Sequence, residues 1–419
     1  MNSKKCNSEK GQAIVYLVIG MVVFLGFVAL AIDGGMALAD RRRSQNGADA
    51  ASLAGGAAAS LVLENDHITY QNWSCYAPAR NSAVDTAISR ASANSFALEK
   101  NLDNHNGVVT ACGSYDYGFF TDVYMDVTVD ISATTKSNFA QVIFPSVLHN
   151  EVDATTRVRP RQPALFGNAL VALSSQPCSG NKYGALFLGN GDTDIVGGGV
   201  FSNGCIRGNG NADVHVTGGG VYGHYIDDNG STFTPAPETT AFTIPLSEYD
   251  IPLPNCSDPN AHHITGNDLE KELKKGPVTL DPGLWCITGD LTINNSAQLY
   301  GTDITIFKPT GKFDVAGAAD IQISAPSSEP DPSPAIGGVL IYLPISNPSA
   351  VTLNGGSGSY YDGMIIAPRS DLKLNGNAAD YVHGQVVGWT VYVSGDNGFG
   401  IDYNPEAGYQ KPTSIELSK

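Results

Sequence analysis

Basic side chains are scarce in this chain of 419 residues. Lysine and arginine together number 24, against 41 aspartates and glutamates, so the formal net charge is -17 at neutral pH. Residues 1–43 hold six basic and three acidic side chains, a net charge of +3, which leaves -20 for the remainder. Such an acidic remainder is repelled by phosphate backbones and by anionic surfaces. We therefore expect no nucleic-acid partner.

Sequence motifs of the common catalytic and cofactor sites are also missing. The chain has no nucleotide-binding loop, nucleophile elbow, haem attachment motif or zinc-protease helix. Hydrophobic residues make up 42% and charged residues 16% of the chain, which is enough to bury the cores of two or three domains. We expect an ordered multidomain protein that is not an enzyme and holds no cofactor and no metal.

A long uncharged run lies near the start of the chain. The twenty residues from Ala13 to Ile32 include no ionisable side chain except Tyr16. A helix of this length spans about 30 Å, the thickness of a hydrocarbon core, so residues 13–32 are predicted to form a transmembrane helix. Two alternatives stay open: a signal peptide cleaved near Ala29-Leu30-Ala31, and a helix buried in a soluble core.

The cysteines indicate which side of the membrane the chain occupies. The number of lysines before the apolar run nearly equals the number of arginines after it, so the positive-inside rule does not determine the orientation of the helix in the membrane. Of seven cysteines, only Cys6 precedes the run, and an even set without Cys-x-x-Cys spacing follows it. This favours disulfides in an oxidising compartment over a metal site, with residues 1–12 as a cytoplasmic tail. Six cysteines allow fifteen connectivities, and we expect the sequential one. It joins Cys75 to Cys112, Cys178 to Cys205, and Cys256 to Cys286.

Residues 33–160 have the pattern of a small α+β domain. Gly47, Ala51 and Gly55 recur every four residues and form a smooth face that another helix can approach closely. The alternative is a helix that is rich in alanine only because alanine favours helix formation. The expected elements are a second helix over residues 79–102 that packs on the first, strands over 123–131 and 151–160, and a short helix over 138–148.

The first helix carries a composite motif. It begins with GQA at Gly11 to Ala13, ends its apolar part with AIDGG at Ala31 to Gly35, and continues as RRRSQNGADAASLAGGA at Arg41 to Ala57. This combination resembles the TadE/TadG-like proteins of the Flp (Tad) pilus system, over roughly the first 160 residues. The resemblance implies a pilin-like domain anchored by one helix in the bacterial inner membrane, with the rest of the chain outside the cytoplasm. Related minor pilins are cut after a glycine and carry glutamate at the fifth mature position. Counted from Gln12, this chain has Tyr16 there, which favours a retained anchor of the TadG kind.

Repetition is the main signal over residues 163–405. Short apolar-polar-apolar segments recur at spacings of 22, 38, 21 and 19 residues, and most are followed by Asn-Gly or a similar turn. Earlier, LGNG at Leu188 repeats as RGNG at Arg207, and GGGV at Gly197 repeats at Gly218. Such residues suit the corners of stacked coils, so a right-handed parallel β-helix, or solenoid, is predicted. An antiparallel β-sandwich is the alternative. The five repeated segments start at Leu291, Phe313, Val351, Leu372 and Val391.

Two segments interrupt the repeats. Several prolines make residues 233–257 an extended excursion. Residues 267–275 have the pattern of a short helix that Asn267 or Asp268 caps and that Gly276-Pro277 ends. Residues 406–419 are expected to be a C-terminal tail.

Acidic residues on the predicted rungs are the strongest candidates for chemistry. Asp192 and Asp194 share one face of a strand, and His215 and His224 fall one coil later, as a polysaccharide-acting enzyme could use them. Aspartates at solenoid corners also cap turns, which is the simpler explanation. Weaker patterns, to which we assign no function, are a partial calcium β-roll repeat at residues 189–195, an Asp-x-Ser sequence at Asp130 to Thr134, and the polar pair His262-His263.

These observations predict a single-pass protein of the bacterial inner membrane whose bulk lies outside the cytoplasm. Its expected role is structural or adhesive, within a Flp/Tad-type pilus or surface assembly. Membrane lipid and pilus or envelope assembly proteins are the expected partners, the proteins meeting the small-residue helix face, and surface polysaccharide is a further candidate. The alternative is a membrane-tethered β-helix enzyme that acts on polysaccharide.

Overall fold

The computed structural model describes residues 12–100, 106–135, 139, 148–189, 191–245, 251–327, 332–354, 358–376, 382–394 and 399–418. The chain divides into two compact units. Unit 1 comprises Met1–Tyr115, Val123–Arg161 and Pro412–Lys419, and unit 2 comprises Asp116–Asp122 and Gln162–Lys411. Unit 2 is therefore inserted between segments of unit 1. The cytoplasmic tail predicted over residues 1–12, apart from Gln12, lies outside the described residues, as does most of the short helix predicted over 138–148.

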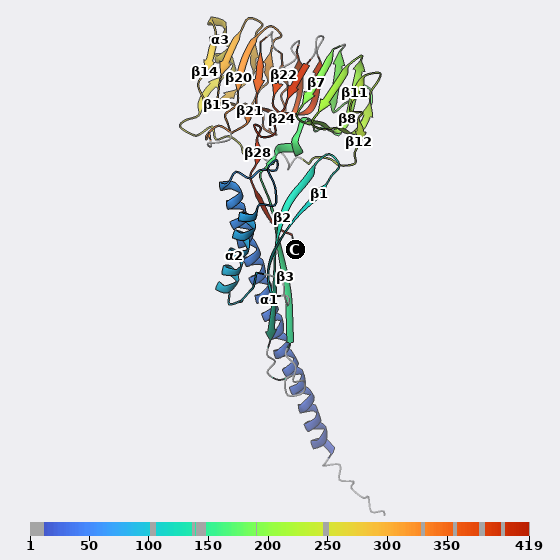
Figure 1. Cartoon of the computed structure of the whole chain (residues 1–419), viewed down its shortest axis with the longest axis vertical. Coiled ribbons are helices and arrows are strands. Elements are labelled where there is room, and N and C mark those ends of the chain that lie inside the picture. Colours follow the sequence, from blue (N-terminus) through green and yellow to red (C-terminus); the bar gives the residue numbers. More distant parts are fainter. Residues whose placement is uncertain are drawn as a thin grey trace, which may run out of the picture. The chain divides into compact units, whose positions relative to one another are not determined.

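The described residues of unit 1 form two helices and a four-stranded sheet (Figure 1). The 54-residue helix α1 spans Gln12–Asn65, and helix α2 spans Ala77–Ala93. The strands follow the order β1-β2-β3-β29, and the pairs β2-β3 and β3-β29 are antiparallel. Their bounds are β1 Gly107–Asp116, β2 Thr121–Thr135, β3 Leu148–Arg159 and β29 Ser414–Leu417.

The core of unit 1 lies where the helices and the sheet meet. One side of α2 consists of alanines at four-residue spacing, Ala79, Ala83, Ala87 and Ala91, and all four are fully buried. Small side chains at this spacing let two helices approach closely. Helix α2 ends earlier than the predicted Leu102, because Asn94 takes a non-helical conformation that ends the helix.

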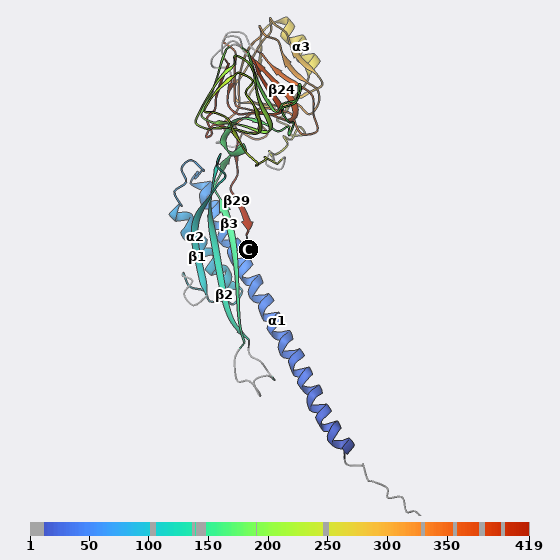
Figure 2. The same cartoon turned by 90° about the vertical axis from the view of Figure 1, so that its right-hand side faces the viewer.

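Unit 2 is built from parallel strands in three rows around a shared interior (Figures 1 and 2). The first row contains β12 Glu238–Thr239, β10 Val221–Asp227, β8 Gly199–Gly210, β5 Asn168–Ala172, β26 Val386–Ser394, β24 Met364–Asn375, β21 Val339–Tyr342, β18 Ile304–Phe307, β15 Gly283–Thr288 and β13 His262–Thr265. The second row contains β16 Leu291–Ile293, β19 Phe313–Val315, β22 Val351–Leu353, the later parts of β24, β26 and β8, and β6 Ala185–Gly189. The third row contains β11 Thr232–Thr234, β9 Asp213–Thr217, β7 Asp192–Val196, β27 Phe399–Asp402, β25 Val382–His383, β23 Tyr360–Asp362, β20 Asp320–Ser324, β17 Gln298–Gly301 and β14 Val278–Leu280.

The sequence repeats pair with one another in register. The first residues of the five repeated segments lie opposite each other in order, and each is fully buried. Among the described strands of unit 2, only the short pair β4 Gln162–Pro163 and β28 Gln410–Lys411 is antiparallel. The alternative of an antiparallel β-sandwich is therefore wrong. The repeat spacing of nineteen residues that LGNG and RGNG suggest is wrong as well. It would place Leu188 opposite Arg207, whereas Leu188 pairs with Asn209.

The order of strands in space differs from their order along the chain. Strand β26, near the end of unit 2, pairs with β5 and β6 at its beginning, for example through Val386 and Leu170. The chain therefore enters the stack in its middle, builds outward to β12, crosses to the far end at β13, and builds back to the middle. One continuous apolar core runs through both halves of the stack and includes Phe187 from the first half and Phe313 from the second.

The predicted interruptions of the repeats cover surfaces of this stack. Within the described part of the excursion, Phe242, Ile244 and Ile251 join a second apolar cluster on the outer side of the first row. Helix α3, Gly266–Lys275, buries Leu269 and Leu273 against the end of the main core. Its capping residue is Thr265, whose Oγ accepts the Asp268 backbone N–H, so the prediction of Asn267 or Asp268 as the cap is wrong.

Residues 406–419, predicted to be a tail, contain two strands instead. Strand β28 pairs with β4 in unit 2, and β29 forms an edge of the unit 1 sheet. A short turn over Ala164–Gly167 follows β4, and its central residues Leu165 and Phe166 have left-handed backbone conformations.

Candidate functional site

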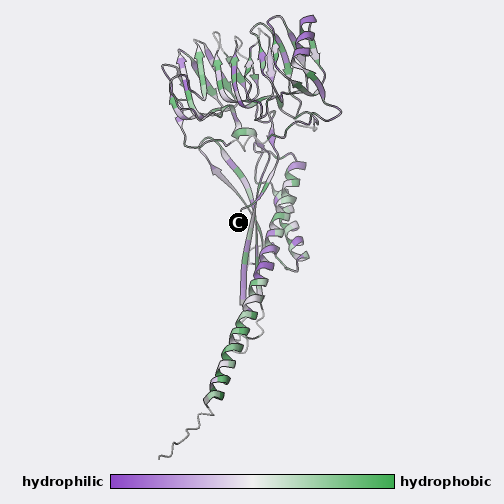
Figure 3. Ribbon diagram, turned by 180° about the vertical axis from the view of Figure 1, so that it is seen from behind, coloured by the Kyte–Doolittle hydropathy of each residue, from purple (hydrophilic) through white to green (hydrophobic). Residues whose placement is uncertain are grey.

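The first half of α1 is made almost entirely of hydrophobic residues, as the green colour of this part of the ribbon shows (Figure 3). From Ile14 to Ile32 the large hydrophobic side chains are 38–70% exposed, and this stretch belongs to a helix long and apolar enough to cross a membrane. The run ends at the buried Asp33, whose carboxylate accepts the Phe139 backbone N–H at 3.1 Å. These exposures contradict the alternative of a helix buried in a soluble core. The signal-peptide alternative stays open.

The small-residue face of α1 is already covered within unit 1. A Cβ added to Gly47 would lie 2.5 Å from the Phe96 ring, and one added to Gly55 would lie 2.7 Å from the Ala83 carbonyl oxygen of α2. Ala51, between them, has no exposed surface. The close helix approach that this face predicts therefore occurs inside the chain. The expectation that assembly partners meet the face is wrong above the membrane, because α2 and the segment after it occupy it.

The six predicted cysteines form three disulfides, which join the pairs of the sequential connectivity. Their Cα–Cα distances are 5.9 Å for Cys75–Cys112 in unit 1, and 5.0 Å for Cys178–Cys205 and 6.0 Å for Cys256–Cys286 in unit 2.

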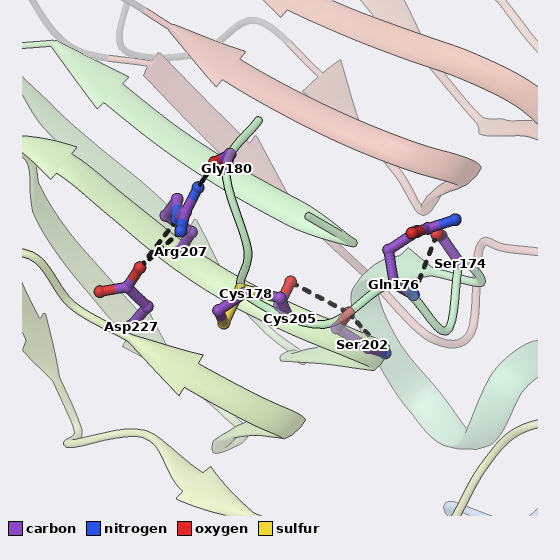
Figure 4. The surroundings of a disulfide bond; sticks show 9 residues. Ser174, Gln176, Cys178, Gly180, Ser202, Cys205, Arg207 and Asp227 are labelled. Atoms are coloured by element: carbon purple, nitrogen blue, oxygen red, sulfur yellow. Dashed lines mark hydrogen bonds and ion pairs between the residues drawn. A yellow bond between two sulfur atoms is a disulfide. The ribbon is translucent and has the colours of Figure 1, made fainter. Parts of the chain in front are cut away.

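The Cys178–Cys205 disulfide ties a loop to strand β8 (Figure 4). On one side of it the Arg207 guanidinium pairs with Asp227 at 2.8 Å and also donates to the Gly180 carbonyl oxygen. On the other side the Ser202 hydroxyl donates to the Cys205 carbonyl oxygen at 3.4 Å. Arg207 and Asp227 lie opposite each other on β8 and β10, so this ion pair also links two neighbouring strands.

The candidate catalytic aspartates lie on the outer side of the third row. Asp192 is opposite Asp213, and Asp194 is opposite His215, in the register of β7 and β9. The His215 Nε2 lies 3.5 Å from the Asp213 Oδ1. His224 is not part of this group, because it lies on β10 in the first row. Among the described residues, no group of three or more His, Cys, Asp and Glu is arranged to hold a metal ion.

Other ionisable groups of unit 2 have shifted pKa values. Burial raises the pKa of Asp362, and His383 on the neighbouring strand opposes that shift. Burial lowers the pKa of Lys308 to about 8, against the attraction of Asp290 and Glu270. The Lys308 ammonium donates to the Gly289 carbonyl oxygen, so this fully buried cation has a backbone partner.

His262, one of the polar pair His262-His263, has an aromatic partner. It is half-buried and stacks on the Trp285 indole, with ring centroids 4.5 Å apart, while His263 is exposed. His262 and Trp285 lie opposite each other on β13 and β15, a register that separate stretches of sequence do not reveal.

With this geometry established, the comparison with known families concerns α1. Residues 11–59 match the family described as "Putative Flp pilus-assembly TadE/G-like". The match confirms the resemblance to TadE/TadG-like proteins over these residues, which include the exposed apolar half of α1 and most of its packed half. No curated protein matches the chain. A TadE/G-like segment and a candidate membrane-spanning helix together indicate a membrane component related to Tad pilus assembly.

An aromatic cluster in unit 2 was missed by the sequence analysis. The ring of Phe119 lies 4.9 Å from that of Phe242, 5.1 Å from Phe201 and 5.7 Å from Phe166. The YDYGFF sequence around Gly118, which has φ +86°, is the signal of a tight turn with apolar residues beside it. That signal does not reveal what the turn packs against.

The contact of the TadE/G-like helix with the C-terminal strand was also missed. The Glu64 carboxylate, beyond the matched residues on α1, accepts the Arg161 Nε–H at 2.6 Å and the Thr413 backbone N–H at 2.9 Å. Burial raises the pKa of Glu64, but the hydrogen bonds from Thr413 and Arg161 outweigh burial and lower it below its usual range. A lowered pKa contributes stability above the unfolded value near 4.5, and this stability is lost as the pH falls through the folded value.

Replacing Glu64 with glutamine is therefore expected to loosen β29. The amides of residues 414–417 should exchange with solvent about 5–30 times faster at neutral pH, because a charge-assisted hydrogen-bond pair is lost. In the wild-type protein, exchange of these amides should become faster in the same way only at acidic pH, where Glu64 is protonated. Hydrogen exchange measured by mass spectrometry tests the effect of the variant and the effect of pH. Glu416→Gln on the same strand is the matched control, since its carboxylate is 53% exposed and its pair with Arg159 contributes little. Equal effects of the two variants would contradict the assignment.

Proposed function

We propose that this chain is a single-pass inner-membrane protein that serves a Flp/Tad-type pilus or surface assembly in a structural or adhesive role. The observation that carries the proposal is the coincidence of the TadE/G-like match at residues 11–59 with the exposed apolar half of α1. In this proposal unit 1 is a pilin-like α+β domain, and unit 2 is a right-handed parallel β-helix presented to the outside. The usual handedness of parallel crossovers supports that assignment.

The disulfides support an orientation with both units outside the cytoplasm. Unit 1 contains one disulfide and unit 2 contains two, all C-terminal to the apolar run. Disulfides form and persist in oxidising compartments, and in bacteria the periplasm is one. The residues before the run, with Cys6, then face the cytoplasm. Tyr16 in place of the glutamate of minor pilins favours an anchor that is retained, and a mature chain that starts at Gln12 would contradict this.

Cysteine labelling in living cells tests the proposed orientation and role together. A strain without the gene is complemented with the wild-type chain or with Ser89→Cys, a substitution at an exposed position of α2. A membrane-impermeant maleimide applied to spheroplasts should label the thiol introduced by Ser89→Cys directly, but Cys6 only after detergent treatment. The complemented strains should carry surface pili or adhere to surfaces, and the deletion strain should lose this property.

Two outcomes would overturn the proposal. Labelling of Cys6 without detergent would place the N-terminus outside. Unchanged pili and adhesion in the deletion strain would separate the chain from the assembly, even with the expected topology.

An enzymatic role is the second candidate, and the acidic outer side of the third row favours it. Asp192, Asp194, Asp213 and His215 lie on adjacent strands with their side chains on the same side of the sheet. A membrane-tethered enzyme acting on polysaccharide could use such carboxylates as acid and base. Turnover of a polysaccharide that is lost on Asp192→Asn or Asp194→Asn would support this role instead of the structural one.

A further inference from the structure

Unit 1 contains a cavity just beyond the apolar half of α1. Its volume is about 510 Å³, within the range of small-ligand sites. Side chains of α1 line one wall, and the end of α2 with the residues after it lines the other. The polar and aromatic residues that the argument uses are Arg42, Arg43 and Asn46 of α1, with Arg90, Asn94 and Phe96 opposite.

The charge of this cavity is opposite to that of the chain. Three arginines and, within the described part of unit 1, no acidic residue line it, whereas the chain as a whole carries -17. No carboxylate among the described residues forms an ion pair with Arg42, Arg43 or Arg90. In an acidic protein, exposed arginines usually have carboxylates nearby. Arg42, Arg43 and Arg90 line one cavity without an ion-pair partner among the described carboxylates, so the cavity is a positive site that no described negative charge compensates. Such a site is complementary to an anion.

The shape of the site depends on Gly47. A Cβ at this position would lie 2.5 Å from the edge of the Phe96 ring, so only glycine lets this ring come so close to α1 in the wall of the cavity. The Arg43 guanidinium is 5.9 Å from the centre of the same ring, within reach of a cation–π interaction that helps to place it. The wall is thus partly apolar and partly cationic, like the boundary between acyl chains and headgroups.

The position of the site along α1 selects the kind of anion. Leu38 is the last large apolar side chain exposed before the arginines, at 62%. Arg42 follows four residues later in the same unbroken helix, about 6 Å further along its axis. Phospholipid headgroups extend about that far beyond the hydrocarbon core. The apolar run itself ends at Ile32, about 15 Å before Arg42 along the helix, but the exposed side chains after it stay uncharged as far as Leu38, because Asp33 is buried. When the hydrocarbon core reaches Leu38, the arginines therefore lie at headgroup level.

We propose that this cavity binds the phosphate of an anionic phospholipid headgroup, such as phosphatidylglycerol. The planar guanidinium groups of Arg42 and Arg90 approach the phosphate oxygens from two helices, and Asn46 and Asn94 donate to the remaining oxygens and to the glycerol hydroxyls. The bound lipid would join α1 to the end of α2 at the membrane surface. The proposal rests on the membrane insertion of α1 but not on the role in pilus assembly.

Lipid retention by the full chain tests this site. The protein is reconstituted into vesicles of phosphatidylcholine and phosphatidylglycerol in equal parts, extracted in mild detergent, and its bound lipids are counted by native mass spectrometry. The wild-type chain should retain phosphatidylglycerol in preference to phosphatidylcholine. The double variant Arg42→Gln with Arg90→Gln should lose this preference by about tenfold or more, because two charge-assisted contacts are removed.

The neighbouring arginine provides the matched control. Arg41→Gln removes a positive charge at almost the same height but not from the cavity, since Arg41 is not among its lining residues. This variant should keep the preference. Flotation of the vesicles and thermal unfolding should be unchanged in all variants, so that a failure of insertion or of folding is recognised separately.

Three results would overturn the proposal. An equal loss in Arg41→Gln would mean that charge near the membrane acts without a specific site. No lipid preference in the wild-type chain would exclude the lipid as occupant. Inorganic phosphate that binds the detergent-solubilised chain and is lost with Arg42 and Arg90, without any preference for phosphatidylglycerol, would assign the site to a soluble anion.

Discussion

Replacing Gly197 with alanine is expected to lower the free energy of unfolding of unit 2 by about 3–5 kcal/mol. Gly197 follows β7 and has φ +81°, a left-handed conformation that a side chain disfavours. A Cβ added there would lie 1.9 Å from the Tyr403 carbonyl oxygen, a backbone atom that cannot move aside like a flexible side chain. The Tyr403 N–H in turn donates to the Val196 carbonyl oxygen at 2.9 Å. The turn at Gly197 is therefore packed against the segment that follows β27.

The size of this effect follows from where the turn lies. Strands β7 and β27 belong to the first and last passes of the chain through the stack, and they pair through Ile195 and Ile401. A side chain at Gly197 forces these two passes apart at the junction where the halves of unit 2 meet. Strain and overpacking should therefore both act there without local relief.

Thermal and denaturant unfolding of the full chain in detergent, followed by circular dichroism, measures the change. The melting temperature of unit 2 should fall by about 10 °C, as expected for a unit of this size. Gly317→Ala is the matched control, because Gly317 is also in unit 2 but has no atom within 4 Å of an added Cβ and no left-handed φ. That variant should stay within about 0.5 kcal/mol of the wild type. Equal stability of the two variants would mean that the first and last passes are not packed together at Gly197.

Local pattern was enough to predict the repeated strands of unit 2 and their parallel direction. Segments such as Val351-Thr352-Leu353 have two buried apolar residues around a half-buried polar one, and their repetition carries the register from one strand to the next. The apolar run of α1 and its small-residue face at Gly47, Ala51 and Gly55 were equally visible. Each of these features depends on residues that are close in the sequence, which is why the sequence reveals them.

The order of the strands could not be predicted in the same way. The pairing of Val386 with Leu170 joins residues far apart in the chain, and nothing in either segment distinguishes this partner from the other apolar strands. Strand β29 is short and its four residues are exposed, so it lacks the alternation that marks a half-buried strand. Of the cavity, only the consecutive arginines that follow the apolar run were visible. Arg90 joins them because α2 ends at Ala93 and packs against α1.

Removing both disulfides of unit 2 is expected to lower its free energy of unfolding by about 7 kcal/mol. Cys178 and Cys205 are separated by 27 residues, and Cys256 and Cys286 by 30. Closing a loop of either length lowers the entropy of the unfolded chain and so raises its free energy by about 3.5 kcal/mol at 25 °C. The two effects should add, because Cys205 lies on β8 and Cys286 on β15, in different halves of the stack.

The quadruple variant with alanine at these four positions tests the expectation by denaturant unfolding. Cys75→Ala with Cys112→Ala is the control, because that pair belongs to unit 1 and its loss should leave the transition of unit 2 in place. Natural domains are stable by about 5–15 kcal/mol, so a loss of about 7 kcal/mol leaves unit 2 partly or wholly unfolded at growth temperature. A quadruple variant as stable as the wild type would show that the core of packed strands alone stabilises unit 2.

If the quadruple variant loses stability as expected, folding of unit 2 requires an oxidising compartment, because a reducing cytoplasm would keep these cysteines as free thiols. The stability of unit 2 and the proposed orientation of α1 would then depend on the same four cysteines.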